Sequence, residues 1–502
     1  MPQPSAPLQW TFSQILGQPT PSDHLQDDDT ITSIEFEKRG DYLAIGDRGG
    51  RVVIFERDDR NNTSNQQHSR KVLEQLDSAP ARHPKFRFKS EFQSHEPEFD
   101  YLKSLEIEQR IKKVRWCHTQ NGLLFILSAN DKTIKLWKIK EHKAKKVKEV
   151  AHLPFVSSEN IFLAERSFMS GQETLSSANG YHLEWTESIT QSMSLSQDIN
   201  TKIAGIDSTL HKKCQKVYAH AHSFNINSIS NNSDCETFIS ADDLRINLWN
   251  FEASDQCFNI IDMKPSNMED LTEVITSAEF HPLHCNLLAY SSSRGFIRLS
   301  DLRQAAICDH SARIFHDGAS NGMKSFFEEI IASISDIKFL NDGQHLISRD
   351  FMNMKLWDMR MDSSPIAVFK IHEHLRPRLH ELYNDDYIFD KFDSCFSGDG
   401  LHFATGSYSN LLRTFSLGSG TEEGIKLDVT GNLDSSKKPL HQAAPKVRRS
   451  SLSNLTRGFY QHGHDSEEIS CNFKSRLLHV AWHPTSNIVA CAAEGSLLLY
   501  NA

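Results

Sequence analysis

Apolar and polar residues alternate in short stretches along this chain, and the same unit recurs seven times. Alternation is typical of half-buried β-strands, because successive side chains of a strand point to opposite faces. Each unit consists of a strand, a polar turn, a second strand, another turn and a third strand. Residues 31–36, 275–280 and 334–339 are the clearest opening strands, and turn formers such as Asp342-Gly343 separate the strands. The pattern therefore predicts an all-β protein built from repeats.

The residues that end several units resemble the Trp-Asp ending of WD40 repeats. Leu356-Trp357-Asp358 is the clearest case, and Trp137 and Trp249 occupy the same place in other units. One small sheet cannot bury both of its faces, so each repeat needs a neighbour on either side. Seven repeats in order predict a seven-bladed WD40-type β-propeller, whose closure removes long exposed edges. Residues 8–12 are strand-like, and we expect them to complete the last blade.

The chain is longer than the ring requires. Seven blades need about 300 residues, whereas the chain has 502. We therefore expect one propeller domain over residues 1–502, with a protruding hairpin and loops in insertions at 58–90, 138–215 and 418–470. The third insertion has few hydrophobic residues, so we expect it to be a disordered loop.

The second insertion begins with a run of lysines that includes Lys143, Lys145 and Lys146. A solvated strand or hairpin extension explains such a run, since charge runs are usually solvated. The alternative is a protruding basic arm that docks on an acidic surface of a partner. The sequence leaves both interpretations open.

Two motifs in the third insertion could carry chemistry. Arg448 and Arg449 precede Ser451 at the spacing that basophilic kinases recognise, which makes Ser451 a candidate phosphorylation site. His462 and His464 could bind a metal ion, but plain exposed histidines are the favoured interpretation in a polar loop.

Composition narrows the partners and the compartment. The formal net charge of −10 disfavours nucleic-acid binding, which needs a basic face, and favours partners rich in Lys and Arg. Nine cysteines without a C-x-x-C pair indicate reduced thiols. We therefore expect a cytoplasmic protein, with the nucleus as a further compartment compatible with reduced thiols. The longest apolar runs are far shorter than the roughly 20 residues of a membrane span.

Catalytic and cofactor-binding motifs are not apparent. The P-loop, nucleophile-elbow and H-E-x-x-H patterns do not occur, so we expect no cofactor, no metal and no catalytic site. His220 and His222 stand at strand spacing without a third ligand nearby, which favours a structural role. His281 and His483 each follow an aromatic strand end and precede Pro, and are interpreted as turn residues.

Several long stretches are similar to one family. Residues 92–105 read FQSHEPEFDYLKSL, residues 130–138 read NDKTIKLWK, and residues 240–249 read SADDLRINLW. Residues 273–275 and 389–392 read EVI and FDKF. In these stretches the chain resembles the WD-repeat B-type (55 kDa) regulatory subunit of the trimeric protein phosphatase 2A.

The resemblance implies a role. Such subunits are not catalytic: they recruit and select phosphorylated protein substrates with basic segments and direct the holoenzyme. The implied partners are a scaffold (A) subunit and a catalytic (C) subunit, and the dephosphorylation chemistry with its metals belongs to the latter. A hairpin arm at about residues 138–170, with Lys143, Lys145 and Lys146, is the implied scaffold contact.

The resemblance also implies a substrate groove on top of the propeller. The residues at matching positions are Asp27, Arg48, Phe99, Leu102, Asp243, Leu271, Tyr383 and Asp386. The family pattern has Glu and Lys where this chain has Asp27 and Arg48. Both exchanges keep the charge sign but change reach and geometry.

The residues themselves leave alternatives for this groove. Asp243 stands between two strand-like runs and hence on a loop. It could contact a basic segment, or it could be the turn aspartate that orders a corner of a WD repeat. Phe99 and Leu102 could line the groove or pack in the core.

A second function is compatible with a WD-repeat propeller. Trp357-Asp358-Met359-Arg360 has the W-D-x-R spacing of substrate receptors of cullin-type ubiquitin ligases, and Ser300-Asp301-Leu302-Arg303 comes close to it. The motif is short and arises wherever WD repeats do. An enzyme on a propeller has no supporting residues.

Overall fold

A computed structural model describes residues 8–17, 27–58, 84–117, 123–143, 208–304, 312–317, 325–417, 424–429, 471–493 and 495–502. The chain divides into two compact units, one formed by residues 1–140 with 210–502 and the other by residues 141–209. Most of the second unit lies outside the described residues, so the architecture below is that of the first.

Seven antiparallel four-stranded sheets, numbered here as blades 1 to 7, build this unit. The inner strands are β2 (Ile31–Phe36), β8 (Lys113–Cys117), β12 (Ser228–Asn231), β16 (Ile275–Phe280), β20 (Ile334–Phe339), β24 (Ser394–Phe396) and β28 (Val480–Trp482). The second strands are β3 (Tyr42–Asp47), β9 (Leu124–Ala129), β13 (Thr237–Ala241), β17 (Leu287–Ser292), β21 (His345–Asp350), β25 (His402–Gly406) and β29 (Ile488–Ala493). The third strands are β4 (Arg51–Asp58), β10 (Ile134–Lys143), β14 (Arg245–Asn250), β18 (Ile297–Asp301), β22 (Asn353–Asp358), β26 (Leu411–Ser416) and β30 (Ser496–Asn501). The outer strands are β5 (Lys85–Gln93), β11 (Ser208–Tyr218), β15 (Cys257–Asp262), β19 (Arg313–Phe315), β23 (Ala367–Lys370), β27 (Ile425–Asp428) and β1 (Thr11–Leu16).

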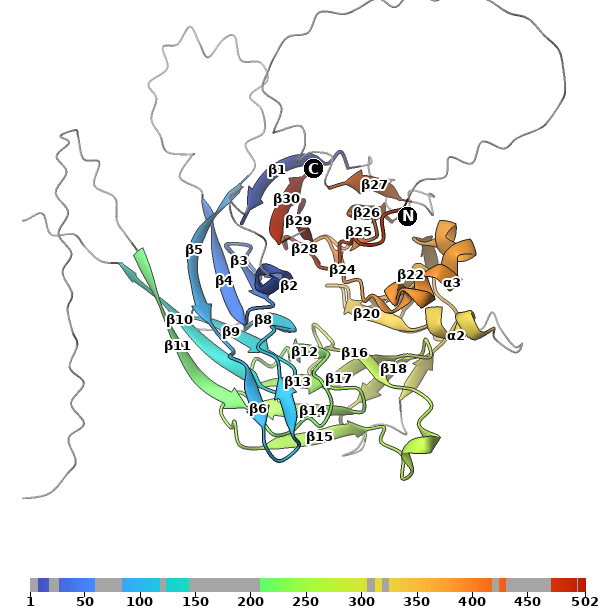
Figure 1. Cartoon of the computed structure of the whole chain (residues 1–502), viewed down its shortest axis with the longest axis horizontal. Helices are drawn as coiled ribbons and strands as arrows, with labels where there is room; N and C mark the ends of the chain where they lie inside the picture. Colours follow the sequence, from blue (N-terminus) through green and yellow to red (C-terminus); the bar gives the residue numbers. More distant parts are fainter. Residues whose placement is uncertain are drawn as a thin grey trace, which may run out of the picture. The chain divides into compact units, whose positions relative to one another are not determined.

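The seven blades form a closed ring. Each inner strand packs against the inner strand of the next blade, and β28 packs against β2, which closes the circle around the axis (Figure 1). Blade 7 combines two distant parts of the chain, because β1 pairs antiparallel with β30 and places Thr11 opposite Asn501. The predicted seven-bladed propeller is confirmed. The segment expected to complete the last blade does so, although its strand is Thr11–Leu16 and not residues 8–12.

The core lies between neighbouring blades. Leu43 of blade 1 packs in one cluster with Leu499 of blade 7, and Ile246 of blade 3 packs with Leu288 of blade 4. Both faces of a blade are covered in this way, which explains the nearly continuous apolar runs of second strands such as β9 and β29. Burial stabilises each such side chain by roughly 1.5–3 kcal/mol relative to exposure.

Hydrogen bonds between blades run around one edge of the ring, which we call the lower edge. It carries the turns from first to second strand and from third to fourth strand. Several bonds join successive blades there, among them His281 Nε2 to Gly343 O (2.8 Å), Asn341 Nδ2 to Gly398 O (3.1 Å) and His483 Nε2 to Gly40 O (3.1 Å). In His281 and His483, Nδ1 accepts two backbone N–H groups of the residue's own turn, which confirms their interpretation as turn residues.

The opposite edge, called the upper face, carries the connections that enter the inner strands and the turns from second to third strand. Consecutive antiparallel strands reverse direction, so these two sets of connections share one edge. Several contain short elements: η1 (Asp27–Asp29), β6 (Glu98–Asp100), β7 (Leu105–Ile107), η3 (Met268–Asp270), α2 (Phe326–Ile331), η4 (Glu373–Arg378), α3 (Leu379–Asn384) and η5 (Tyr387–Phe389). Long connections of this kind usually carry function.

The outer strands are the main difference from the predicted repeat, which has three strands. β5, β11 and β27 overlap the predicted insertions 58–90, 138–215 and 418–470. β11 alternates weakly, with the sequence STLHKKCQKVY, because an outermost strand buries little apolar surface, whereas β5 alternates clearly as KFRFKSEFQ. The rest of these insertions lies outside the described residues and stays a prediction.

Candidate protein-binding site

All eight residues of the predicted groove lie on the upper face. Six lie on connections that enter an inner strand: Asp27, Phe99, Leu102, Leu271, Tyr383 and Asp386. The other two, Arg48 and Asp243, lie in turns between second and third strands. They are spread over the connections of several blades, so the face offers an extended surface and not one pocket.

The structure separates Asp243 from its neighbour Asp242. Asp242 is fully buried, and its Oδ1 accepts the backbone N–H groups of Leu244 (2.9 Å) and Arg245 (2.7 Å). Its Oδ2 bonds to His222 Nδ1 at 3.0 Å. Asp242 is therefore the turn aspartate that orders the corner of blade 3. Asp243 is therefore not the residue that orders this turn, and its carboxylate is available for other contacts.

The surroundings of Asp243 make it a charged contact point. Burial raises the pKa of Asp243 above its usual range, while Lys391 and Lys132 nearby and a hydrogen bond with Asn227 act against that rise. The carboxylate is half-buried at the surface. A partly desolvated carboxylate of this kind gains more from a basic side chain than a fully solvated one does.

Phe99 and Leu102 belong to a hairpin on the connection into blade 2. β6 and β7 pair with Phe99 opposite Glu106, and Asp100 Oδ1 accepts the N–H of Leu102 (3.0 Å) at the tip. Phe99 is 49% exposed and Leu102 is 99% exposed. The core-packing alternative for these two residues is therefore wrong, and the hairpin presents apolar side chains to the solvent.

Asp27 and Arg48 form an ion pair, with Arg48 Nη1 2.7 Å from Asp27 Oδ2. Both side chains are exposed, so the pair adds at most about 1 kcal/mol to stability. The exchange from the family's Glu and Lys thus keeps two opposite charges at this point.

An upper aromatic patch, defined here as Phe326, Phe327, Tyr383 and Phe389, is the part of the face that sequence analysis missed except for Tyr383. Tyr383 packs edge-on against Phe326 with ring centroids 5.3 Å apart, and Phe389 is 6.0 Å away. Phe326 and Phe389 are more than half exposed. The adjacent phenylalanines, preceded by a Ser325-x-x-Glu328 capping box, were the available signal.

Leu271 and Asp386 complete the predicted set. Leu271 ends η3 and is half-buried. Asp386 precedes η5, is exposed and has a left-handed backbone (φ 62°). Exposed large apolar groups beside carboxylates are typical of surfaces that bind other proteins.

Comparisons with known proteins agree with this picture. A family model described as "WD domain, G-beta repeat" matches residues 212–250. The B beta isoform of the serine/threonine protein phosphatase 2A 55 kDa regulatory subunit from Arabidopsis thaliana is 52% identical, covering 100% of this chain and 98% of that protein. The B alpha isoform from the same plant is 51% identical (99% and 98% covered), and the B-type regulatory subunit of protein phosphatase PP2A from Schizosaccharomyces pombe is 43% identical (98% and 98% covered).

This chain belongs to the B family of 55 kDa regulatory subunits of protein phosphatase 2A. The similarity to this B family found in the sequence is therefore confirmed. The relatives are named as regulatory subunits, in agreement with the interpretation of the chain as a regulator without a catalytic site. The names do not support the ubiquitin-ligase alternative.

The W-D-x-R residues also have a local explanation. Arg360 Nη2 lies 3.2 Å from its own Asp358, and Arg303 lies 2.6 Å from its own Asp301. These arginines fold back on the aspartates that close the third strands. The spacing therefore follows from the end of a WD repeat in this B-family chain.

The charged axis of the ring holds blades together. Lys113 of blade 2 reaches Asp393 of blade 6 at 3.0 Å, and His479 of blade 7 reaches the same carboxylate at 2.7 Å. Burial alone would raise the pKa of Asp393, but Lys113 and His479 outweigh it and hold that pKa far below its usual range. Lys113, Asp393 and the Arg115–Glu35 pair line an axial cavity of about 310 Å³. These charges are paired across blades, so we assign them to the framework.

Metal ligation and membrane insertion find no support in the described part of the chain. No group of three or more His, Cys, Asp or Glu residues there could hold a metal ion. Every helix there is too short or too polar to cross a membrane. His222 is buried between Asp242 and Ser240, which confirms the structural role expected for it.

Several predicted residues cannot be placed. Lys143 ends β10, whereas Lys145, Lys146, Ser451 and the pair His462 and His464 lie outside the described residues. Their roles stay predictions.

Proposed function

We propose that this chain is the substrate-selecting member of a protein phosphatase 2A heterotrimer, held together with a scaffold (A) subunit and a catalytic (C) subunit. The upper face would recruit phosphorylated proteins through their basic segments and so direct the holoenzyme. One observation carries the proposal. Because Asp242 accepts the turn amides, the carboxylate of Asp243 is not needed for the turn, and it lies half-buried on a face with exposed apolar side chains.

The energetics favour several weak contacts. A basic side chain at about 4 Å from Asp243 gains about 4 kcal/mol of Coulomb attraction at an effective dielectric constant near 20, before desolvation. Desolvation and salt reduce that figure to a fraction. Leu271, the β6–β7 hairpin and the upper aromatic patch supply apolar area beside the charge. Together these contacts would hold a segment while the catalytic subunit removes the phosphate.

A charge reversal tests the groove. The full chain is assembled with A and C subunits, and the rate of dephosphorylation is measured on a phosphopeptide with a basic flank. Asp243→Lys should lower kcat/KM at least about tenfold, a loss of one contact worth roughly 1.4 kcal/mol. Co-purification with the A subunit should not change.

A matched control lies on the other edge of the same blade. Asp255 is exposed in the lower connection between β14 and β15, and Asp255→Lys makes the same charge change away from the proposed groove. Equal loss of activity in both variants would reject the groove. So would an Asp243→Lys variant that loses the A subunit together with substrate capture.

The lysine arm has a separate test. Replacing Lys143, Lys145 and Lys146 with Glu should abolish co-purification with the A subunit, because an acidic partner surface would then repel the arm. Unchanged assembly would reject the scaffold-contact role.

We also propose that the protein works in the cytoplasm and the nucleus. The eight cysteines that the structure describes are all unpaired, which suits a reducing compartment. Fractionation of cells followed by detection of the chain checks the assignment, and recovery from the secretory compartment would contradict it.

A further inference from the structure

Blade 3 contains a closed hydrogen-bond network of four buried side chains, Trp249, Ser240, His222 and Asp242. Trp249 Nε1 donates to Ser240 Oγ (2.8 Å). His222 Nε2 lies 2.6 Å from Ser240 Oγ, and Nδ1 lies 3.0 Å from Asp242. Since a carboxylate only accepts, Nδ1–H donates to Asp242, and the Ser240 hydroxyl donates to Nε2. Every donor and acceptor of the imidazole ring is satisfied.

Blade 5 repeats this framework without a histidine. Ser348 pairs in register with Lys355, as Ser240 pairs with Asn247 in blade 3. Trp357 Nε1 donates to Ser348 Oγ at 2.9 Å.

Asp350 is the equivalent of Asp242. Its Oδ1 accepts the backbone N–H groups of Met352 and Asn353 at 2.9 and 2.6 Å. Among the described residues, no histidine bonds to Ser348 or Asp350.

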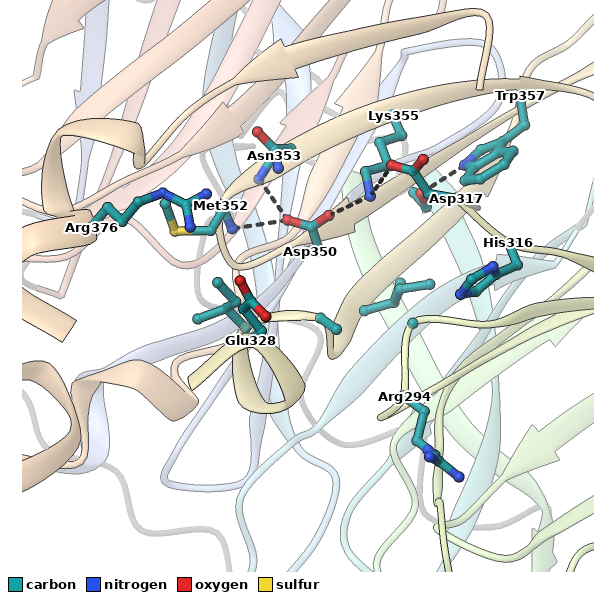
Figure 2. Close-up of a pocket in the computed structure, with 15 residues that line it drawn as sticks. Arg294, His316, Asp317, Glu328, Asp350, Met352, Asn353, Lys355, Trp357 and Arg376 are labelled. Carbon is teal, nitrogen blue, oxygen red and sulfur yellow. Dashed lines mark hydrogen bonds and ion pairs between the residues drawn. The ribbon is translucent and has the colours of Figure 1, made fainter. Parts of the chain in front are cut away.

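A cavity of about 290 Å³ occupies this place in blade 5. Ser348, Asp350, Lys355, Trp357, Asp317 and Glu328 are among the residues that line it. Figure 2 shows Asp350 in the middle of the lining, with its ion pair to Lys355 above it and Asp317 beyond. His316 also lines the cavity, but its ring stacks on Phe296 with centroids 4.9 Å apart.

Hydrogen-bond capacity is left over at the floor of the cavity. Ser348 is 2% exposed and lines the cavity, and its oxygen accepts from Trp357, while its own O–H has no acceptor among the described residues. Asp350 Oδ2 has only the Lys355 ammonium, at 3.3 Å, within the described part of the chain. The floor therefore offers one hydroxyl donor and one carboxylate acceptor at positions that hold an imidazole ring in blade 3.

We propose that this cavity binds the imidazole ring of a histidine supplied by a protein segment that crosses the upper face. The ring would donate one N–H to Asp350 and accept the Ser348 hydroxyl at its other nitrogen. That the segment belongs to a recruited substrate rests on the proposed function, whereas the affinity of the cavity for imidazole does not.

The lining argues against other ligands. Three carboxylates, of Asp317, Asp350 and Glu328, line the cavity, and the ammonium of Lys355 already lies between two of them. At the floor an anion would meet the carboxylate of Asp350, although Arg294 and Arg376 also line the cavity. A guanidinium has five N–H donors and no acceptor, so it would leave the Ser348 hydroxyl unpaired. A neutral imidazole satisfies both groups.

The place of the cavity suits a crossing segment. Glu328 and Ile331 of α2 line it, and Phe326 and Phe327 of the same helix belong to the upper aromatic patch. Arg294, Glu328 and Arg376 at the lining are exposed, so the cavity opens to the solvent beside the patch.

The test uses a small probe on the full chain. Saturation-transfer NMR measures binding of 4-methylimidazole, the side-chain analogue of histidine, at about pH 9, well above the ordinary pKa of the ring. The matched probe is 1-methylimidazole, which has no N–H for Asp350. We expect saturable binding of the first probe and at least about fivefold weaker binding of the second, the usual effect of one hydrogen bond.

Two variants locate the site. Ser348→Ala should weaken the binding of 4-methylimidazole about fivefold. Thermal unfolding of the variant is recorded to show that the chain still folds. Lys355→Asn introduces the residue that blade 3 has at this position, Asn247. It should strengthen the binding of 4-methylimidazole severalfold, because Asp350 Oδ2 loses its ion pair with Lys355 and can accept the N–H of the probe.

Absence of saturable binding, equal binding of the two probes, or no response to Lys355→Asn would overturn the proposal. Binding that occurs only in His316→Ala would also overturn it, because the chain's own His316 would then be the occupant. Failure of Asp243→Lys to impair substrate capture would count against the groove and leave the imidazole result standing.

Discussion

The lower edge and the upper face of the ring differ in what their side chains contact. At the lower edge, His281, Asn341 and His483 direct their polar atoms to the backbone of the next blade. On the upper face, Asp243 and the β6–β7 hairpin present charge and apolar area to the solvent. Binding residues can therefore be identified by the hydrogen-bonding groups and the apolar area that the fold leaves unused. Residue type alone is a weaker guide.

The comparison is sharpest between two adjacent residues of the upper face, Asp242 and Asp243. Asp242→Ala should lower the free energy of unfolding by about 3 kcal/mol or more, because two turn amides and His222 lose a buried partner. Asp243→Ala should change it by less than about 1 kcal/mol. Urea unfolding of both variants measures the two effects, and equal losses would break the distinction between framework and binding carboxylates.

The lower edge should respond strongly to loss of one ring. His483 is fully buried, and its ring makes three hydrogen bonds, to Gly40, Thr485 and Ser486. His483→Ala should cost about 2–3 kcal/mol of unfolding free energy and leave substrate capture unchanged. His284, exposed in the turn of blade 4, is the control, and His284→Ala should cost less than about 0.5 kcal/mol.

Acid should weaken the framework of the ring. Burial, helped by Lys135, lowers the pKa of His95 to about 3, and burial also lowers the pKa of His281 and His483. A histidine that stays neutral when folded loses stability as pH falls below its unfolded pKa of about 6.5, by about 2 kcal/mol at pH 5 for His95 alone. Urea unfolding at pH 7 and at about pH 5 measures this loss of unfolding free energy. In His95→Gln, the difference between the two pH values should be smaller by about 2 kcal/mol. Constant stability across this range would contradict it.

The smallest effect on stability should come from the upper aromatic patch. Phe389 is 54% exposed, so Phe389→Ala should change the free energy of unfolding by no more than about 1 kcal/mol. It should nevertheless weaken capture of a phosphorylated, basic substrate severalfold in the assembled heterotrimer. Phe258, 65% exposed on the outer strand β15, is the matched control, and an equal loss in Phe258→Ala would show that the patch has no special role.

The ring was predictable because its signal is repeated. Inner strands bury both faces, so their Val, Ile and Trp residues recur at similar places in successive units, and errors in one unit are corrected by the others. The sequence pattern did not predict the outer strands, because β11 and β27 carry few apolar residues. Strand pairing with β10 and β26 determines them more than their own sequence does.

The site was predictable in position but not in detail. Loop residues such as Asp243 and Tyr383 could be assigned to one face from the order of the strands and from the family resemblance. The division of labour between Asp242 and Asp243 could not, because identical neighbouring side chains differ only in where the turn directs them. Nor could the cavity of blade 5, which depends on how residues distant in sequence come together around Ser348 and Asp350.

The pairing of β1 with β30 has a consequence for the making of the protein. Thr11 leaves the ribosome long before Asn501, its partner in the sheet. At about 5 to 20 residues per second, that interval lasts about 25 to 100 seconds. During that time the blade 7 side of the cluster around Leu43 is absent, and the first blade has one face bare. Apolar surface on that face therefore stays exposed to solvent until residues 496–501 are made and β30 can form.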